Sequence, residues 1–324
     1  MCNSTFQVSY RRKVYEEIAT LAYQRRTKEA FKWLPEWIVS HVGTTESTED
    51  IFSDLDYAAE LCSAALGMEP SRYLNTLAAP SFDTEADATV PFVGVLTSLC
   101  HKCTSALDAE PPCLSACPSN ALSLTAAGRA VIDPTACVSC GACIGACAQG
   151  AVVDKSCLYP VIRSIGDGRP VLALLMPGLS EQFAAVLRSD QLTSAFRMLG
   201  FQDVFEVGST ARPYLSANPE QLSQEIASMV AGAHAVTPDT IVVSVTSSAL
   251  SKLDIVHSMR TAGVDHVLTL EELMGMLAAR GISPEILRDC DEEPLKYTRG
   301  EDHLPQYTKE EGVKIDDTAA KMCG

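Results

Sequence analysis

The stretches CHKCTSALDAEPPCLSACPSNALSL (residues 100–124) and CVSCGACIGACAQGAVV (residues 137–153) hold eight of the chain's 13 cysteines. The first has the spacing Cys-x2-Cys-x9-Cys-x3-Cys, and the second has the spacing Cys-x2-Cys-x2-Cys-x3-Cys. In both stretches the fourth cysteine is followed by a short turn, an alanine and apolar residues. The second stretch is therefore an internal repeat of the first with a shorter middle loop, and its cysteines organise the fold of this region.

The second spacing is that of bacterial ferredoxins, in which three close cysteines bind one 4Fe–4S cluster and the fourth binds the other cluster. Two-residue gaps let the backbone turn around a cluster, and Gly141 permits a close backbone approach. Applied to both stretches, the pattern predicts two 4Fe–4S clusters in a ferredoxin-like module. The predicted ligands are Cys100, Cys103, Cys113 and Cys147 for the first cluster, and Cys137, Cys140, Cys143 and Cys117 for the second. Ala148 stands where a proline usually follows the fourth cysteine, so we expect that turn to be less constrained.

Two other uses of clustered cysteines, zinc sites and disulfides, fit this spacing less well. Paired zinc sites usually show two Cys-x2-Cys pairs far apart, and a disulfide framework belongs to oxidising compartments. Arg11 and Arg12 are followed by Glu16 and Glu17 rather than by an apolar segment, so we expect no secretory signal and a cytoplasmic protein. Cys157 lies outside both repeats and is interpreted as a buried thiol or as a ligand of another group.

The composition limits the partners of the chain. A net charge of −16 argues against nucleic acid and anionic membrane surfaces. No apolar run reaches the roughly 18 residues that a membrane span requires. The expected partner is a redox protein, either a ferredoxin or a subunit of an oxidoreductase.

The pattern of apolar and charged residues changes along the chain, and we expect an α+β fold overall. The predicted parts are a helical N-terminal domain (1–95), a two-cluster ferredoxin-type module (96–160), a parallel α/β domain (165–290) and an acidic, exposed tail (291–324). Within the first part, a helix is predicted over Ile51–Leu66, and Trp33 and Trp37 are predicted to pack in the core.

The α/β prediction rests on alternating apolar runs and helix-period stretches. Strands are predicted at Val171–Met176, Val204–Val207, Thr240–Val245 and His266–Thr269. Helices are predicted at Glu181–Leu199, Pro219–Ala231, Lys252–Thr261 and Leu270–Arg280. Strands that alternate with helices in this way indicate a parallel sheet.

The order of these parts resembles the catalytic chain of iron-only (FeFe) hydrogenases, in the branch with a helical leader before the ferredoxin module. The resemblance is carried by VLALLMPGLSEQFAAVLRSDQLTSAFRMLGFQDVFEVGSTA (residues 171–211), by VDHVLTLEELMGMLAARGI (residues 264–282) and by the cysteine module. It covers most of residues 10 to 290 and implies that the α/β part is similar to a portion of the hydrogenase domain.

The hydrogen-activating site of that family does not carry over. The family holds this cluster with four cysteines from three motifs, T-S-C-C-P, P-C-x-x-K-K and E-x-x-x-C-x-x-x-C. Here no cysteine lies between Cys157 and Cys290, and residues 243–252 read VSVTSSALSK where the second motif is expected. Without thiolates a soft iron–sulfur centre has no ligands, and a fold alone does not transfer a function.

The sequence therefore predicts an electron-transfer iron–sulfur protein that is hydrogenase-like but lacks the hydrogen-activating site. We expect it not to be an enzyme by itself, and we predict no catalytic residues. If it is enzymatic, it is a ferredoxin-linked oxidoreductase of the hydrogenase type. Two alternatives stay open: a redox sensor or scaffold, and an FeFe hydrogenase that acts with a partner chain.

Overall fold

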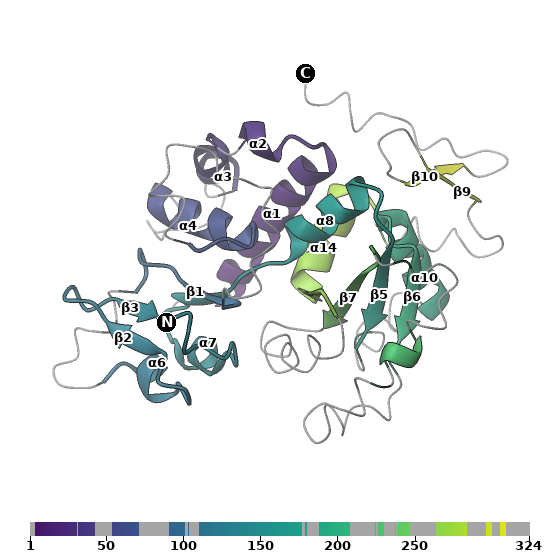
Figure 1. Cartoon of the computed structure of the whole chain (residues 1–324). Helices are drawn as coiled ribbons and strands as arrows, with labels where there is room; N and C mark the ends of the chain where they lie inside the picture. The colour runs from purple at the N-terminus through teal and green to yellow at the C-terminus, as the bar shows by residue number, and fades with distance from the viewer. Residues whose placement is uncertain are drawn as a thin grey trace.

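A computed structural model of the chain shows mixed helix and strand with a parallel sheet (Figure 1). It describes residues 4–30, 32–42, 54–70, 91–100, 103, 110–176, 179, 188–207, 224, 226–229, 237, 239–246, 264–283, 296–299 and 305–308. This α+β class is the one that the sequence predicts. Within the described residues, no helix combines the length and the apolar character needed to cross a bilayer.

The N-terminal part is helical, as predicted. Its helices are α1 (Ser4–Tyr23), α2 (Thr27–Ala30), α3 (Leu34–Val42) and α4 (Leu55–Ala65). Helix α4 begins later than Ile51, because Asp54 caps it: its carboxylate accepts the amides of Asp56 at 2.8 Å and Tyr57 at 3.4 Å. The linker predicted between Pro80 and Pro91 falls largely on residues 80–90, which lie outside the described residues.

The prediction that Trp33 and Trp37 pack in the core is wrong. Their exposed fractions are 40% and 36%, whereas Leu34 and Ile38 are fully buried. The inward face of α3 is thus one residue further along than predicted. The ring of Trp37 stacks on His41 with centroids 3.5 Å apart, and its Nε1 donates to Glu17 at 3.2 Å.

The cysteine-rich region is built from two antiparallel strand pairs and two short helices (Figure 1). Strand β1 (Val93–Val95) pairs with β4 (Val152–Asp154), and β2 (Leu122–Leu124) pairs with β3 (Ala130–Ile132). The helices are α6 (Pro112–Ser115) and α7 (Ala142–Ala146). Because β1 precedes the first cysteine stretch and β4 ends the second, their pairing closes the region into one unit.

The parallel sheet has the order β6-β5-β7-β8. Its strands are β5 (Val171–Leu175), β6 (Asp203–Glu206), β7 (Ile241–Thr246) and β8 (His266–Thr269), each within one residue of a predicted strand. Around them lie α8 (Leu158–Gly166), α10 (Ser189–Leu199) and α14 (Leu270–Ala279). Within the helix predicted at Pro219–Ala231, residues 226–229 are helical. The helix predicted at Lys252–Thr261 lies outside the described residues. The order places β5 and β7 in the centre, as in doubly wound sheets.

The two faces of the sheet belong to different cores. On one face, Ala173 and Val243 join a core that also contains Ile18 of α1, Met276 of α14 and Val153 of β4. On the other face, Leu174, Val242 and Val267 pack with Ile226 in a smaller cluster. The first core therefore runs without a break from the helical leader through the cysteine-rich region to the sheet.

The tail predicted from residue 291 contains structure. Strand β9 (Lys296–Arg299) pairs antiparallel with β10 (Pro305–Thr308), and β10 contacts α10. The exposure of the predicted tail stays a prediction, and within it these eight residues pair as two strands.

Candidate metal centre

The eight cysteines of the two repeats all lie in the described residues. Cys113 and Cys143 are the buried members inside α6 and α7; Cys147 directly follows α7, and Cys117 lies one residue beyond the end of α6. Cys100 is buried in the turn that follows β1. The ten cysteines that the structure describes are free of disulfides.

Four thiols form a first group around Cys113. Burial raises the pKa of Cys113, and the nearby thiols of Cys147, Cys100 and Cys103 raise it further. Burial also raises the pKa of Cys100, where the amide of Ala130, 3.1 Å from the sulfur, opposes the rise and Cys103 and Cys147 add to it. Charging these thiols together is thus unfavourable without a bound cation.

The other four thiols form a second group around Cys143. Burial raises the pKa of Cys143 to about 12, and Cys137, Cys140 and Cys117 contribute through their charge. Cys117 belongs to the first sequence stretch and Cys147 to the second, so each group takes its fourth member from the other repeat. We call these sets the Cys113 group and the Cys143 group.

The two repeats are alike in their turns. The amides of Ala121 and Ala151 donate to the sulfurs of Cys117 and Cys147 at 3.3 Å each. The carbonyls of the same cysteines accept amides three residues on, at 3.2 Å in the first turn and 3.0 Å in the second. Both turns thus have the same hydrogen bonds, with Pro118 in the first and Ala148 in the second, and a less constrained second turn stays a prediction.

The loop around Cys140 has an unusual backbone. Gly141 has φ of +74°, and its neighbour across the cysteine, Ser139, has φ of +56°. A left-handed conformation suits glycine and is uncommon for other residues. Ser139 is held there in part by Phe92, whose amide donates to the Ser139 hydroxyl at 3.1 Å. The role of Gly141 is therefore conformational, and no sequence pattern indicates the left-handed backbone of Ser139.

The donor set fits two iron–sulfur clusters. Thiolates are the ligands that such clusters take, each group offers four, and backbone amides donate to sulfurs of Cys100, Cys117 and Cys147. Among the described residues, no three His, Cys, Asp or Glu side chains gather as ligands of a single metal ion.

Glu60 supports the Cys113 group from α4, and sequence reasoning misses it. Its buried carboxylate accepts the amides of Thr97 at 2.8 Å and Ser98 at 3.0 Å, and the hydroxyls of both residues, that of Ser98 at 2.6 Å. These residues form the turn that presents Cys100, whose amide bonds the carbonyl of Leu96. A glutamate on the apolar face of a helix is the signal that could have identified it.

Lys155 supplies a buried positive charge beside the Cys143 group. Its exposed fraction is 3%, and its ammonium donates to Glu69 at 3.2 Å. Burial lowers the pKa of Lys155, while Glu69 and the nearby Cys137 raise it. Its amide bonds the carbonyl of Phe92 at 2.7 Å, and the amide of Phe92 bonds Ser139, so the lysine backbone is tied to the Cys137–Cys140 loop.

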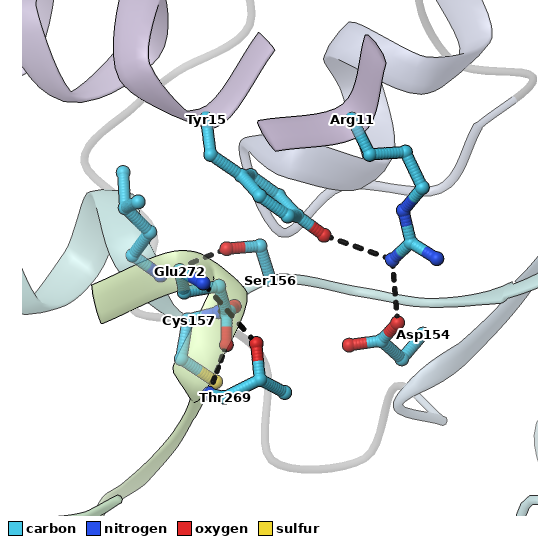
Figure 2. Close-up of polar contacts among 8 residues, drawn as sticks. Arg11, Tyr15, Asp154, Ser156, Cys157, Thr269 and Glu272 are labelled. Atoms are coloured by element: carbon cyan, nitrogen blue, oxygen red, sulfur yellow. Dashed lines mark hydrogen bonds and ion pairs between the residues drawn. The ribbon is translucent and has the colours of Figure 1, made fainter. Parts of the chain in front are cut away.

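A polar junction joins the cysteine-rich region to α1 (Figure 2). The guanidinium of Arg11 donates to Asp154, at the end of β4, and to the hydroxyl of Tyr15, both at 2.9 Å. Asp154 is 2% exposed. A buried carboxylate needs such a partner to remain charged.

A second polar contact joins the same region to α14. Glu272 is fully buried and accepts the amides of Cys157 at 3.0 Å and Thr269 at 2.5 Å (Figure 2). Thr269 caps α14 in return by accepting the amide of Glu272. Cys157 is buried, which agrees with its interpretation as a buried thiol. His101, between the first two cysteines, lies outside the described residues.

The fold and the site define a class: a candidate thiol-ligated metalloprotein, in which a cysteine-rich region joins a helical leader that packs directly on helices α8 and α14 of the α/β part (Figure 1). No protein-family model matches the chain. The chain is similar to a tetrathionate reductase subunit from Archaeoglobus fulgidus, with 41% identity over 59 residues. That match covers 18% of this chain and 26% of the relative, so the chain spans about a quarter of that protein.

Proposed function

We propose that the chain is an electron-transfer protein with two 4Fe–4S clusters, one on the Cys113 group and one on the Cys143 group. The observation that carries the proposal is the exchange of Cys117 and Cys147 between the groups. This exchange is what a two-cluster ferredoxin spacing requires, and isolated zinc sites do not need it.

The chain's own residues would bind, orient and shield the clusters. When bound, each cluster accepts and releases one electron. Amides of Ala121, Ala130 and Ala151 donate to ligand sulfurs and favour negative charge there. Gly141 and Ser139 shape the loop that presents Cys140. The burial of Cys100, Cys113 and Cys143 limits water at one side of each group.

The partner in this proposal is another redox protein, a ferredoxin or an oxidoreductase subunit. Its support is the similarity to the tetrathionate reductase chain, which by name is one subunit of a reductase. The acidic chain, with a net charge of −16, suits a partner with a basic docking patch.

We also propose that the chain is hydrogenase-like and lacks the hydrogen-activating site. Support comes from β7: its buried residues Val243–Thr246 carry no thiol at the place where the resemblance expects the second ligand motif. Protein matured together with hydrogenase cofactor-assembly proteins should evolve no hydrogen from reduced viologen. Turnover tied to a bound diiron centre would favour the alternative of a hydrogenase that acts with a partner chain.

Metal analysis and ligand variants test the two-cluster proposal. The chain purified without oxygen should contain about eight irons and eight sulfides, and its dithionite-reduced EPR spectrum should show two interacting clusters. Cys103→Ser should remove one cluster and Cys140→Ser the other. The matched control is Cys157→Ser, a buried cysteine outside both groups, which should retain both clusters. Stoichiometric zinc, or loss of the same cluster in both variants, contradicts the proposal.

A redox sensor is the second candidate, and the polar junctions favour it. Asp154 follows the second repeat closely and bonds Arg11 of α1, and Cys157 bonds Glu272 of α14 (Figure 2). A change in the cluster region therefore has hydrogen-bonded routes to both helices. Hydrogen exchange of the oxidised and reduced protein distinguishes the candidates: a sensor changes the protection of α14 on reduction, whereas an electron carrier does not.

A further inference from the structure

The repeat makes the two cysteine groups alike in their turns, but their surroundings carry different charges. Each group has one turn amide on a ligand sulfur at 3.3 Å. The Cys113 group has Arg129 nearby, an exposed side chain whose charge acts on Cys100. The Cys143 group has Lys155 nearby, which is 3% exposed.

The position of Lys155 is fixed by its packing. Its stem lies over β1, because a Cβ added at Gly94 would stand 3.8 Å from the Lys155 Cγ. The same added atom would collide with the ring of Pro70 at 2.7 Å, so Pro70 and Lys155 cover the strand at a place where only glycine fits. Glu69 precedes that proline and accepts from the ammonium. The lysine head is thus held at Glu69 and is shielded from solvent, while its backbone is tied through Phe92 to the loop of Cys137 and Cys140.

Burial decides how strongly each cation acts. Adding one electron to a cluster adds one unit of negative charge, and a nearby cation stabilises the reduced form. Solvent and salt screen the charge of an exposed side chain, whereas a buried charge is screened much less. Glu69 is 46% exposed, so its opposing charge is screened more strongly than that of Lys155.

One feature of the Cys113 group acts in the same direction. The amide of Ala130 donates to Cys100 at 3.1 Å, and such hydrogen bonds also favour reduction. One amide dipole is a fraction of a unit charge, whereas Lys155 carries a full one. Among the described residues, the balance of charges therefore favours the Cys143 group as the more easily reduced site.

We propose that the buried ammonium of Lys155 raises the reduction potential of the cluster on the Cys143 group above that of the cluster on the Cys113 group. The inference rests on the proposed two-cluster function. An external one-electron donor, such as dithionite or a reduced ferredoxin, loses one electron and the cluster gains it, with no proton transferred. The first electron to enter the chain resides on the Cys143 group, and the second group fills afterwards.

Potentiometric titration followed by EPR tests the assignment. The wild-type chain should show two midpoints. Lys155→Met should lower the higher midpoint, so that at a fixed solution potential its ratio of reduced to oxidised cluster falls about tenfold, which is 59 mV for a one-electron couple. Lys155→Arg, which keeps the charge, should restore most of the shift. Arg129→Met is the matched control at the exposed cation: it should move the lower midpoint by much less, and less still at high salt.

The outcomes separate the inference from the function on which it rests. A wild-type chain without two reducible clusters refutes the proposed function itself. If the chain has two clusters but Lys155→Met moves neither midpoint, or moves the lower one instead, the inference about Lys155 is wrong and the proposed function stands. If Lys155→Met fails to bind iron, Lys155→Gln takes its place, since its amide retains a hydrogen bond toward Glu69, and the same midpoints decide.

Discussion

At the scale of single residues, the buried charges of this protein have identifiable partners. The carboxylate of Glu60 has four hydrogen-bond donors from Thr97 and Ser98. Asp154 has Arg11, and Lys155 has Glu69. A buried charge without such partners is strongly destabilising. These residues tie the helical leader and the cysteine-rich region together at points that no local pattern predicts.

Replacing Glu60 tests its role in positioning Cys100. In Glu60→Gln one acceptor oxygen becomes a donating amide, so hydrogens of Thr97 or Ser98 lose their acceptor. We expect a loss of about 1–3 kcal/mol in the free energy of unfolding, the usual cost of unsatisfied buried polar groups. We also expect the cluster on the Cys113 group to be lost before the other, measured as iron per chain and by EPR.

The control for this variant is Glu36→Gln, because Glu36 is an exposed glutamate of α3 in the same helical leader. It should leave both stability and iron content unchanged. Equal loss of both clusters in Glu60→Gln would show that Glu60 supports the whole fold rather than the Cys100 turn.

Glu271 gives the junction a pH dependence. Burial raises its pKa above the ordinary value of 4.5, Arg11 opposes the rise, and Asp154 and Glu272 add to it. A carboxyl whose pKa is raised on folding stabilises the protein below about pH 4.5, and this stability is lost as the pH rises through the folded pKa. Glu271→Gln should therefore be more stable than the wild type near neutral pH, with a difference that shrinks toward pH 4.5. Thermal midpoints across this range check it, and a difference independent of pH contradicts it.

At the scale of elements, the contact between α1 and α14 depends on a glycine. A Cβ added at Gly275 would stand 2.9 Å from the Cβ of Tyr15 and 3.2 Å from the amide nitrogen of Glu16. These atoms belong to the backbone or lie next to it, so a rotamer change cannot relieve the collision. The two helices approach this closely only because position 275 has no side chain.

Gly275→Ala should consequently destabilise the chain by about 1–3 kcal/mol, the usual cost of overpacking, although alanine is the better helix former by about 1 kcal/mol. Chemical denaturation measures the difference. Gly166→Ala is the matched control, since its added Cβ meets only the flexible end of Arg25 at 3.7 Å. If both variants are equally stable, the helices separate without cost and the contact is less tight than described.

At the scale of the whole molecule, one core joins the three parts that the sequence divides. It includes Ile18 of α1, Val153 of β4 and Met276 of α14. Whether the N-terminal domain, the cysteine module and the α/β domain fold separately stays a prediction. The shared core indicates that α1 depends on α14 and α8 for the burial of one face.

Truncation tests that dependence. A fragment of residues 1–159 lacks α14 and nearly all of α8, and exposes apolar side chains of α1 that each gain about 1.5–3 kcal/mol from burial. Several such losses approach the total stability of a typical domain, about 5–15 kcal/mol. We expect the fragment to unfold without cooperativity, as followed by circular dichroism, and to bind less than the full iron content. A fragment that unfolds cooperatively with both clusters would show that the module is independent and that the α/β half serves another purpose, such as docking a partner.

Local pattern alone determines much of this protein. The cysteine spacing identifies the eight thiols that gather in two groups, and the apolar runs at β5 and β7 locate buried strands within one residue. Within each stretch such signals lie a few residues apart, because a turn, a strand face or a helix face is set by neighbours in the chain.

Tertiary structure alone decides the rest. Glu60 meets Ser98 across 38 residues, and Cys157 meets Glu272 across 115. The exposure of Trp33 and Trp37 likewise depends on which face of α3 the fold covers. Apolar periodicity shows that a face is to be buried, but the partner surface, and with it the surroundings of every buried charge, follows from the packing of distant segments. The charges that would make two similar cysteine groups unequal are therefore visible only in the folded chain.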